Sequence, residues 1–394
     1  MKQTKDKPAK NWLVAITGCV MLLFSGVPSA WGIFRKEVCE QYSFTEESSA
    51  FVLNVTVAAF GIGCVIGGYL QDKKGSFLVS IMGSILLSSG FGIAAILPEN
   101  NIWLFYLGFC IPAGLGCAFL YPAVMSCIQK CNPNHKGFAT GIAVLGFGLS
   151  GLVLTVIKLF TVKLWGVRGS FLFLAASIAI LCTAGSFLMK CPPMKDSNAK
   201  KEDVTPRQLI KTKAYWWLTL AVFFTAPAVL LFSPKIVEMA QERNLAPEIA
   251  VWIVAFGGAL NAAGRLLLPA LSDKWGRKPT AIGGILLLGL VSVGFAFAQS
   301  WLVFLGYGVL CFFYSGVSAL LPSFCTDLFG TRWAGANYGL VALGMTAGSL
   351  LFPPLVGALG GKTLAHWVAV LCCGLAAFCY FRVPMNQQKN QHFL

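Results

Sequence analysis

The stretch LNAAGRLLLPALSDKWGRK, residues 260–278, contains an arginine within an apolar run and ends in a charged turn. Arg265 lies eight residues before Asp273, which corresponds to roughly 12 Å along a helix. If the run crosses a bilayer whose apolar core is about 30 Å thick, Arg265 lies close to its middle. A charge at that depth costs a few kcal/mol on even the most lenient scale. The rest of the sequence should therefore indicate whether this segment is a membrane helix and what compensates the charge of Arg265.

The composition is that of a membrane protein. The 394 residues are 57% hydrophobic and only 11% charged, with a mean hydropathy of +0.73, which leaves too little charge for a soluble surface. Apolar runs of about 20 residues, enough to span a bilayer as a helix, recur along the chain, and none shows the alternation of a membrane β-strand. We therefore predict an all-α membrane protein with twelve transmembrane helices. The predicted spans are 11–34, 47–70, 77–97, 101–127, 137–161, 167–189, 214–238, 247–271, 279–299, 301–328, 335–359 and 364–383.

Three sets of residues repeat along the chain at nearly one spacing. The matches are GGYLQDKKG (67–75) with LPALSDKWGRK (268–278); Gly108, Gly116, Leu120 and Pro122 with Gly308, Gly316, Leu320 and Pro322; and GIAVLGFGLSG (141–151) with GLVALGMTAGS (339–349). Their offsets of 201, 200 and 198 residues predict two pseudo-symmetric six-helix bundles. We place the N-terminal half at 1–189 and the C-terminal half at 214–394. The polar segment 190–213 between them is predicted to be a cytoplasmic linker.

The net charge of +15 is distributed in a way that orients the chain. Lys and Arg concentrate before residue 11, near 73 and 130–136, in 190–213, in 274–278 and in the tail. These segments share one side of the twelve-span arrangement, which by the positive-inside rule is the cytoplasm. We expect a multi-pass protein of the plasma membrane with both termini cytoplasmic, and no nucleic-acid partner. The first span lacks a small-residue cleavage site and is predicted to be retained.

The fourteen cysteines lie mostly within predicted spans and only Cys39 falls in an outer loop, so we expect small buried side chains rather than a disulfide framework. Cys127, Cys131 and His135 have a loose ligand spacing. Pro133 interrupts the helix that would align them, and no fourth ligand is apparent. We expect neither a metal site nor a cofactor.

Arg265 is the only Lys or Arg placed deep in a predicted span, and all fifteen acidic residues lie in loops, tails or span ends. Asn261, one turn earlier, offers a hydrogen bond but no charge. A midplane guanidinium without a built-in counter-ion indicates a counter-ion that arrives from solution, namely an anionic substrate. The alternative is an arginine that extends to the inner membrane interface.

Two loops also resemble a motif of the major facilitator superfamily, in which Asp-Arg/Lys is followed by glycine and further basic residues. These are DKKG (72–75) and DKWGRK (273–278). An aspartate at a helix end can pair with cations and with helix N-termini, and so latch two halves in one state; ordinary basic loops are the alternative. The predicted latch residues are Asp72, Lys73, Gly75, Asp273, Lys274, Gly276, Arg277 and Lys278.

Segments 135–151, 260–278 and 328–340 more closely resemble the oxalate/formate antiporter and bacterial monocarboxylate transporter family. The resemblance implies transport of a small carboxylate by alternating access through a central cavity, with Arg265 at the position of the carboxylate-binding arginine. Family members that carry dicarboxylates have a second cation, a lysine, where this chain has Met345, aligned on NYGL (337–340). The pseudosymmetric residue, Phe147, is also apolar.

One cation facing apolar walls favours a monocarboxylate such as lactate or pyruvate as the substrate. The predicted substrate-binding residues are Arg265, Asn261, Tyr121, Trp31, Phe147, Tyr314 and Met345. Each aromatic residue among them is also compatible with ordinary core packing.

The sequence is compatible with more than one mode of energy coupling and with several other functions. Eukaryotic monocarboxylate transporters have a proton-site aspartate where this chain has Asn261, so anion exchange and symport of a proton with the substrate are both possible. Oxalate/formate exchange or a sugar, drug or amino-acid carrier are alternative functions, although a sugar carrier would have more buried polar side chains than Asn54 and Asn261. We expect no enzyme, because the three histidines form no catalytic constellation. We expect no sensor, because the linker is short, and we expect a monomer.

Overall fold

The computed structural model describes residues 8–132, 135–190, 203–233, 236–250, 252–359 and 362–384. All regular elements in these ranges are helices. Ten of the described helices are long and apolar enough to cross a membrane, and a shorter apolar helix precedes them. The predicted all-α membrane fold is confirmed.

The helices of the first half are longer or more broken than the twelve-span prediction. Their bounds are α1 Pro8–Phe24, α2 Val27–Tyr42, α3 Glu46–Lys74, α4 Ser76–Ile96, α5 Ile102–Phe105, η1 Tyr106–Cys110, α6 Ile111–Cys131 and α7 Lys136–Ser186. The first predicted span is divided into α1 and α2, where a proline at the start of α2 has no N–H to continue α1. The fifth and sixth spans form one element, α7, which turns at Gly166 with a positive φ of 67°.

The second half contains α8 Pro206–Leu209, α9 Lys213–Thr225, α10 Pro227–Leu230, α11 Ile236–Glu242, α12 Pro247–Ala250, α13 Trp252–Trp275, α14 Arg277–Phe297, α15 Trp301–Phe329, α16 Ala334–Leu359 and α17 Lys362–Arg382. The seventh predicted span is divided among α9, α10 and α11. The helix restarts at Pro227, the first residue of α10, for the same reason that α2 does.

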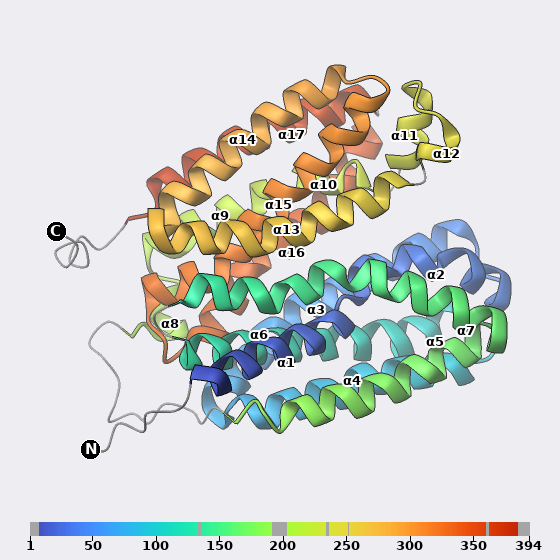
Figure 1. Ribbon diagram of the computed structural model, residues 1–394, viewed down its shortest axis with the longest axis horizontal. Helices are drawn as coiled ribbons and strands as arrows, with labels where there is room; N and C mark the ends of the chain where they lie inside the picture. Colours follow the sequence, from blue (N-terminus) through green and yellow to red (C-terminus); the bar gives the residue numbers. More distant parts are fainter. Residues whose placement is uncertain are drawn as a thin grey trace.

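Figure 1 shows two groups of helices, α1–α7 and α9–α17, lying side by side. We call the end of the molecule at which α1 begins and α17 ends the proximal end, and the opposite end the distal end. The two groups contact each other chiefly through α3 with α16 and through α7 with α13. They lie closest at the proximal end and diverge toward the distal end (Figure 1).

Glycines allow this close approach. A Cβ atom on Gly68 of α3 would lie 2.2 Å from the carbonyl oxygen of Gly335, and one on Gly137 of α7 would lie 2.2 Å from that of Pro269. Both distances are shorter than any real contact, so the backbones meet only because these side chains are absent. The two halves are thus packed backbone to backbone at the proximal end.

The repeated sequence motif forms the same tight turn in each half. Gly75 joins α3 to α4 with φ 89°, and Gly276 joins α13 to α14 with φ 87°. Only glycine adopts this backbone conformation without strain, which explains why the motif contains a glycine after the charged residues. Both turns lie at the proximal end.

The predicted linker is described only in part, since residues 191–202 lie outside the described ranges, as do the basic residues 1–7 and the tail 385–394. Within the described part, the Asp203 carboxylate accepts hydrogen bonds from the N–H groups of Thr331 (3.0 Å) and Arg332 (3.3 Å). The N–H of Val204 donates to the carbonyl oxygen of Phe329 (2.9 Å). The end of the linker therefore lies against the turn between α15 and α16.

Candidate functional site

Arg265 lies near the middle of α13 and is half-buried. Its Nε donates a hydrogen bond to Asn261 Oδ1 at 2.9 Å, and its guanidinium carbon lies 5.1 Å from the ring centroid of Phe147 in α7. Asn261 is one turn nearer the distal end, so this bond holds the guanidinium back from the proximal end of α13. The cation–π contact covers one face of the group.

The outer edge of this guanidinium has no acidic partner. Among the described residues, Arg265 forms no ion pair, and its two terminal nitrogens make no hydrogen bond. That edge carries the paired N–H groups with which arginine binds a carboxylate bidentately. The local geometry can therefore receive a planar anion.

A stacked pair of tyrosines lies next to Phe147, the ring that contacts the arginine. Tyr121 of α6 is 5% exposed and its ring meets the edge of Phe147, with centroids 5.7 Å apart. It also stacks on Tyr338 of α16, again at 5.7 Å, and the two side chains share a hydrogen bond. The positive charge of Arg265 acts on the phenols of Tyr121 and Tyr314. Of the predicted residues, Asn261 and Phe147 thus contact Arg265 directly. Tyr121 contacts Phe147, and Tyr314 is within range of the charge of Arg265.

Two other predicted residues are placed differently. The indole nitrogen of Trp31 donates to the carbonyl oxygen of Ser49 at 3.0 Å, and its ring packs against Phe105 and Phe109. Its polar atom is thus already bonded within the first half. Met345 lies in the middle of α16 and packs partly against the core. A substrate contact by either residue stays a prediction.

Asp72 forms a contact between the halves at the proximal end. It lies in the last turn of α3 and is only 6% exposed. Its Oδ1 accepts a hydrogen bond from the N–H of Gly335 at 3.1 Å, and its Oδ2 accepts one from that of Ala336 at 2.8 Å. Both N–H groups belong to the first turn of α16, where helix N–H groups lack partners and the helix dipole favours an anion. We call this the Asp72 contact.

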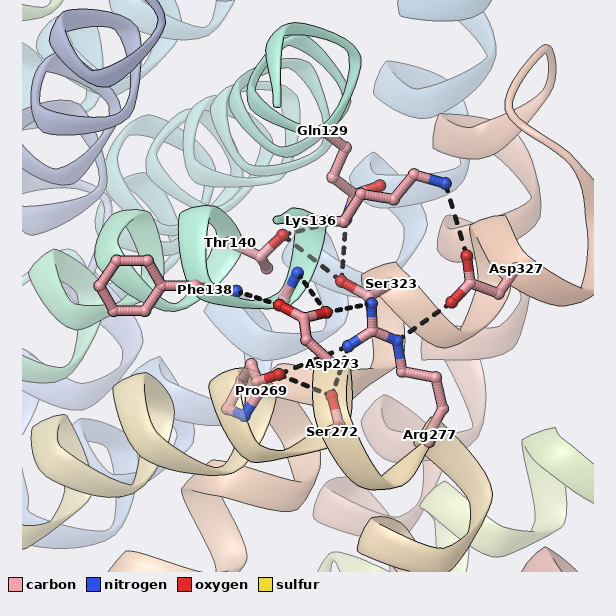
Figure 2. A network of polar contacts seen from close by, with 12 residues as sticks. Gln129, Lys136, Phe138, Thr140, Pro269, Ser272, Asp273, Arg277, Ser323 and Asp327 are labelled. Atoms are coloured by element: carbon pink, nitrogen blue, oxygen red, sulfur yellow. Dashed lines mark hydrogen bonds and ion pairs between the residues drawn. The ribbon is translucent and has the colours of Figure 1, made fainter. Parts of the chain in front are cut away.

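Asp273 forms the equivalent contact with the roles of the halves exchanged. Its two carboxylate oxygens accept hydrogen bonds from the N–H groups of Gly137 (3.1 Å) and Phe138 (3.0 Å), in the first turn of α7 (Figure 2). We call this the Asp273 contact. Each repeated aspartate therefore caps a helix of the opposite half.

Further charges reinforce the Asp273 contact, as Figure 2 shows. Arg277 pairs with Asp273 at 2.7 Å and with Asp327 of α15 at 3.0 Å, and it also donates to the hydroxyl of Ser272. Lys136 of α7 pairs with the other oxygen of Asp327 at 3.4 Å. The network therefore ties α13, α14 and α15 to the start of α7.

A neutral cluster lies beside these charges (Figure 2). The amide nitrogen of Gln129 donates to the hydroxyl of Thr140 at 3.2 Å, and the hydroxyl of Ser323 donates to the same oxygen at 3.5 Å. Gln129 and Thr140 belong to α6 and α7, whereas Ser323 belongs to α15. Polar as well as charged groups thus join the halves at the proximal end.

The other predicted latch residues lie around the two turns without joining the halves directly. Lys73 is exposed and its ammonium lies 4.5 Å from the ring centroid of Tyr69. Lys274 is also exposed, and Lys278 donates to the carbonyl oxygen of Val383 at 2.8 Å. Gly75 and Gly276 form the turns described above.

Sequence reasoning missed several residues of these sites. Among them are Tyr338, which stacks on Tyr121, and Lys136, Asp327 and Gln129 at the proximal end. Tyr338 belongs to the NYGL segment, whose resemblance to the transporter family is a sequence signal that could have indicated it. Asp327 offered none from the repeat, because the residue 200 positions earlier is Cys127.

These features define a helical multi-pass membrane protein whose halves meet around a central arginine and close at one end. The profile of the Major Facilitator Superfamily matches residues 13–341 and 218–393, and the chain belongs to this superfamily of secondary transporters.

Relatives with curated descriptions are similar over most of the chain. The uncharacterized MFS-type transporter YhjX of Escherichia coli is 26% identical, covering 86% of this chain and 86% of its own. The oxalate:formate antiporter of Oxalobacter formigenes is 25% identical, covering 81% and 78%. Monocarboxylate transporter 2 of Meriones unguiculatus is 23% identical, covering 90% and 79%.

Solved structures support the fold. The transporter FucP in the outward conformation superposes with a TM-score of 0.71 over 95% of this chain and 100% of its own, at 16% identity. At that identity, the likeness concerns the fold alone.

Proposed function

We propose that the protein carries a small monocarboxylate, such as lactate or pyruvate, across the plasma membrane by alternating access. The observation that carries the proposal is that the two terminal nitrogens of the Arg265 guanidinium, in the middle of α13, make no hydrogen bond with the described residues. A carboxylate is the anion that matches two parallel N–H donors in geometry. The described relatives include an oxalate:formate antiporter and a monocarboxylate transporter, which supports the same substrate class.

The size and charge of the substrate follow from the surroundings of the arginine. Phe147 lies against the guanidinium of Arg265, Tyr121 contacts Phe147, and Tyr338 stacks on Tyr121. No second cation lies among these groups, so a second carboxylate would enter without a partner, which is costly in a poorly solvated site. A single carboxylate with a small apolar or hydroxylated tail suits the site best.

The orientation in the membrane follows from the basic residues. We assign the proximal end, where α1 begins and α17 ends, to the cytoplasm, because the basic residues of the turns after α3 and α13 lie there. In that orientation, the Asp72 and Asp273 contacts close the cytoplasmic side, and the chain is in an outward-facing state. The two contacts then act as a latch that breaks when the transporter opens inward.

Transport by purified protein in proteoliposomes tests this function. Vesicles loaded with unlabelled lactate should accumulate labelled lactate or pyruvate by counterflow, while sugars and neutral amino acids in the same assay should not exchange. An imposed pH gradient without internal anion separates proton symport from exchange, since only symport then drives uptake. Counterflow of a sugar with no counterflow of any carboxylate would overturn the proposal.

A further inference from the structure

The Asp72 and Asp273 contacts have the same hydrogen-bond geometry but different supporting charges. Asp273 has Arg277 beside it, and Arg277 is also held by Asp327. The residue 201 positions before Arg277 is Ser76, and the residue 200 positions before Asp327 is Cys127. At the repeated positions, the Asp72 contact therefore has neither the arginine nor the second carboxylate of its counterpart, although Asp72 is the more buried of the two aspartates.

Lys130 lies in the last turn of α6, next to this contact. The amide nitrogen of Gln71 donates to the hydroxyl of Ser126 at 2.9 Å, which fixes how α3 lies against α6. Asp72 follows Gln71 directly, and Lys130 is one turn beyond Ser126 on the same face of α6. The charge of Lys130 acts on Asp72.

The ammonium of Lys130 is in an unusual position for a lysine. Its Nζ atom is buried and makes no hydrogen bond with the described residues. The hydroxyl of Ser76 is also buried and makes no hydrogen bond with them. Lysine side chains usually extend until the charge reaches water, and a buried cation without a nearby anion is strongly unfavourable. Asp72, which follows Gln71 on the facing helix, is the carboxylate on which its charge acts.

We propose that Lys130 is the positioning residue of the Asp72 contact, with the role for Asp72 that Arg277 has for Asp273. Its ammonium holds the carboxylate between α6 and the first turn of α16, so that both oxygens face the N–H groups of Gly335 and Ala336. The inference rests on the proposed latch function of that contact. In the Asp273 contact the supporting cation, Arg277, directly follows the turn after α13. In the Asp72 contact the supporting cation lies instead at the end of α6.

Amide hydrogen exchange followed by mass spectrometry tests this without substrate. In the purified full-length protein, Lys130→Gln should accelerate exchange in the first turn of α16 by at least about fivefold, because its N–H groups lose a firmly held acceptor. Lys130→Arg should keep exchange within about twofold of the wild type, since it restores a cation. The first turn of α7, held by Asp273, is the internal control and should not change in either variant.

A double-mutant comparison separates a role through Asp72 from a general effect on folding. In an Asp72→Asn background, Lys130→Gln should add nothing to the faster exchange at α16, because the two residues act as a unit. Wild-type exchange in Lys130→Gln, the same added factor in both backgrounds, or an equal rise at the first turns of α16 and α7 would each overturn the proposal.

The transport assay distinguishes a failure of the Lys130 inference from a failure of the proposed transport function. If Lys130→Gln loosens the start of α16 while carboxylate transport proves absent from the wild type, the substrate assignment fails and the role of Lys130 stands. If transport is present, Lys130→Gln should lower turnover with little change in substrate affinity, and Lys130→Arg should recover most of it.

Discussion

The guanidinium carbon of Arg265 lies over the ring of Phe147, 5.1 Å from its centroid, although the two residues belong to different halves of the chain. Phe147 contacts Tyr121 of its own half, and Tyr121 in turn stacks on Tyr338 of the other. A chain of ring contacts therefore leads from the arginine to residues of both halves. In the alternating access that we propose, rotation of the halves would break these contacts, so the state of the central site would depend on their relative position.

Replacing Arg265 tests whether it binds the substrate. Arg265→Lys keeps the charge but loses the two parallel donors. A charge-assisted hydrogen bond contributes about 1.5–3 kcal/mol, so kcat/KM for carboxylate uptake should fall by about 10- to 100-fold, with normal folding and membrane level. Near-normal uptake by Arg265→Ala would refute the assignment and favour an arginine that only extends to the membrane interface.

Met345 tests the choice between monocarboxylates and oxalate. An unpaired second carboxylate costs several kcal/mol on entering the site, so the wild type should bind oxalate at least about 100-fold less tightly than lactate or pyruvate. Met345→Lys should narrow that difference by supplying a second cation. Competition of oxalate against labelled lactate uptake measures both, and potent competition in the wild type would contradict the one-cation model.

The two aspartates should govern turnover rather than binding. Asp72→Asn and Asp273→Asn each remove the charge that the first turn of the opposite helix attracts, which changes the balance between the two states. We expect slower exchange across proteoliposomes with substrate affinity within about threefold of the wild type. Loss of affinity with turnover intact in both variants is the result that the latch role does not allow.

The glycine contacts give a steric test of the same closure. Gly68→Ala places a methyl group 2.2 Å from the Gly335 carbonyl oxygen, so the halves have to separate at the proximal end. We expect this variant to favour the opposite state, measured as lower accessibility of distal-end positions to a membrane-impermeant reagent. Gly151→Ala is the matched control, because nothing lies within 4 Å of its added Cβ, and an identical response of the two variants would refute the steric argument.

Arg243 provides a prediction on stability away from the central site. It donates to the Phe295 carbonyl oxygen at 2.6 Å and contacts His366 Nε2 at 3.0 Å. Burial lowers the pKa of Arg243 and Glu242 acts in the opposite direction, but arginine stays charged at neutral pH. Arg243→Gln should lower the free energy of unfolding by about 2 kcal/mol, measured as a lower melting temperature. Lys274→Gln, at an exposed position, should leave the melting temperature unchanged.

The sequence determined the class of fold, the doubled turn motif and the position of Arg265 near the middle of a long helix. Each depends on a regular or local signal: long apolar runs, a repeat near 200 residues, and helical rise from Asp273 to Arg265. The glycines of the turns were also predictable, because a positive φ restricts the residue type at one position. The breaks in the first and seventh spans were missed, since a proline in an apolar run reads equally as a kink or as a helix start.

Only the tertiary structure decided which groups of different helices meet. Tyr338 contacts Tyr121 across the two halves, and Asp327 pairs with Arg277 within the second half. Lys130 acts on Asp72 within the first half. Their geometry depends on how whole bundles pack, and neither apolar periodicity nor the repeat specifies it. The same is true of Trp31, whose bond to Ser49 is formed by the particular packing of α2 against α3. Hydrogen-bond partners of buried groups are set by packing, because each buried donor takes the acceptor that the fold brings within reach.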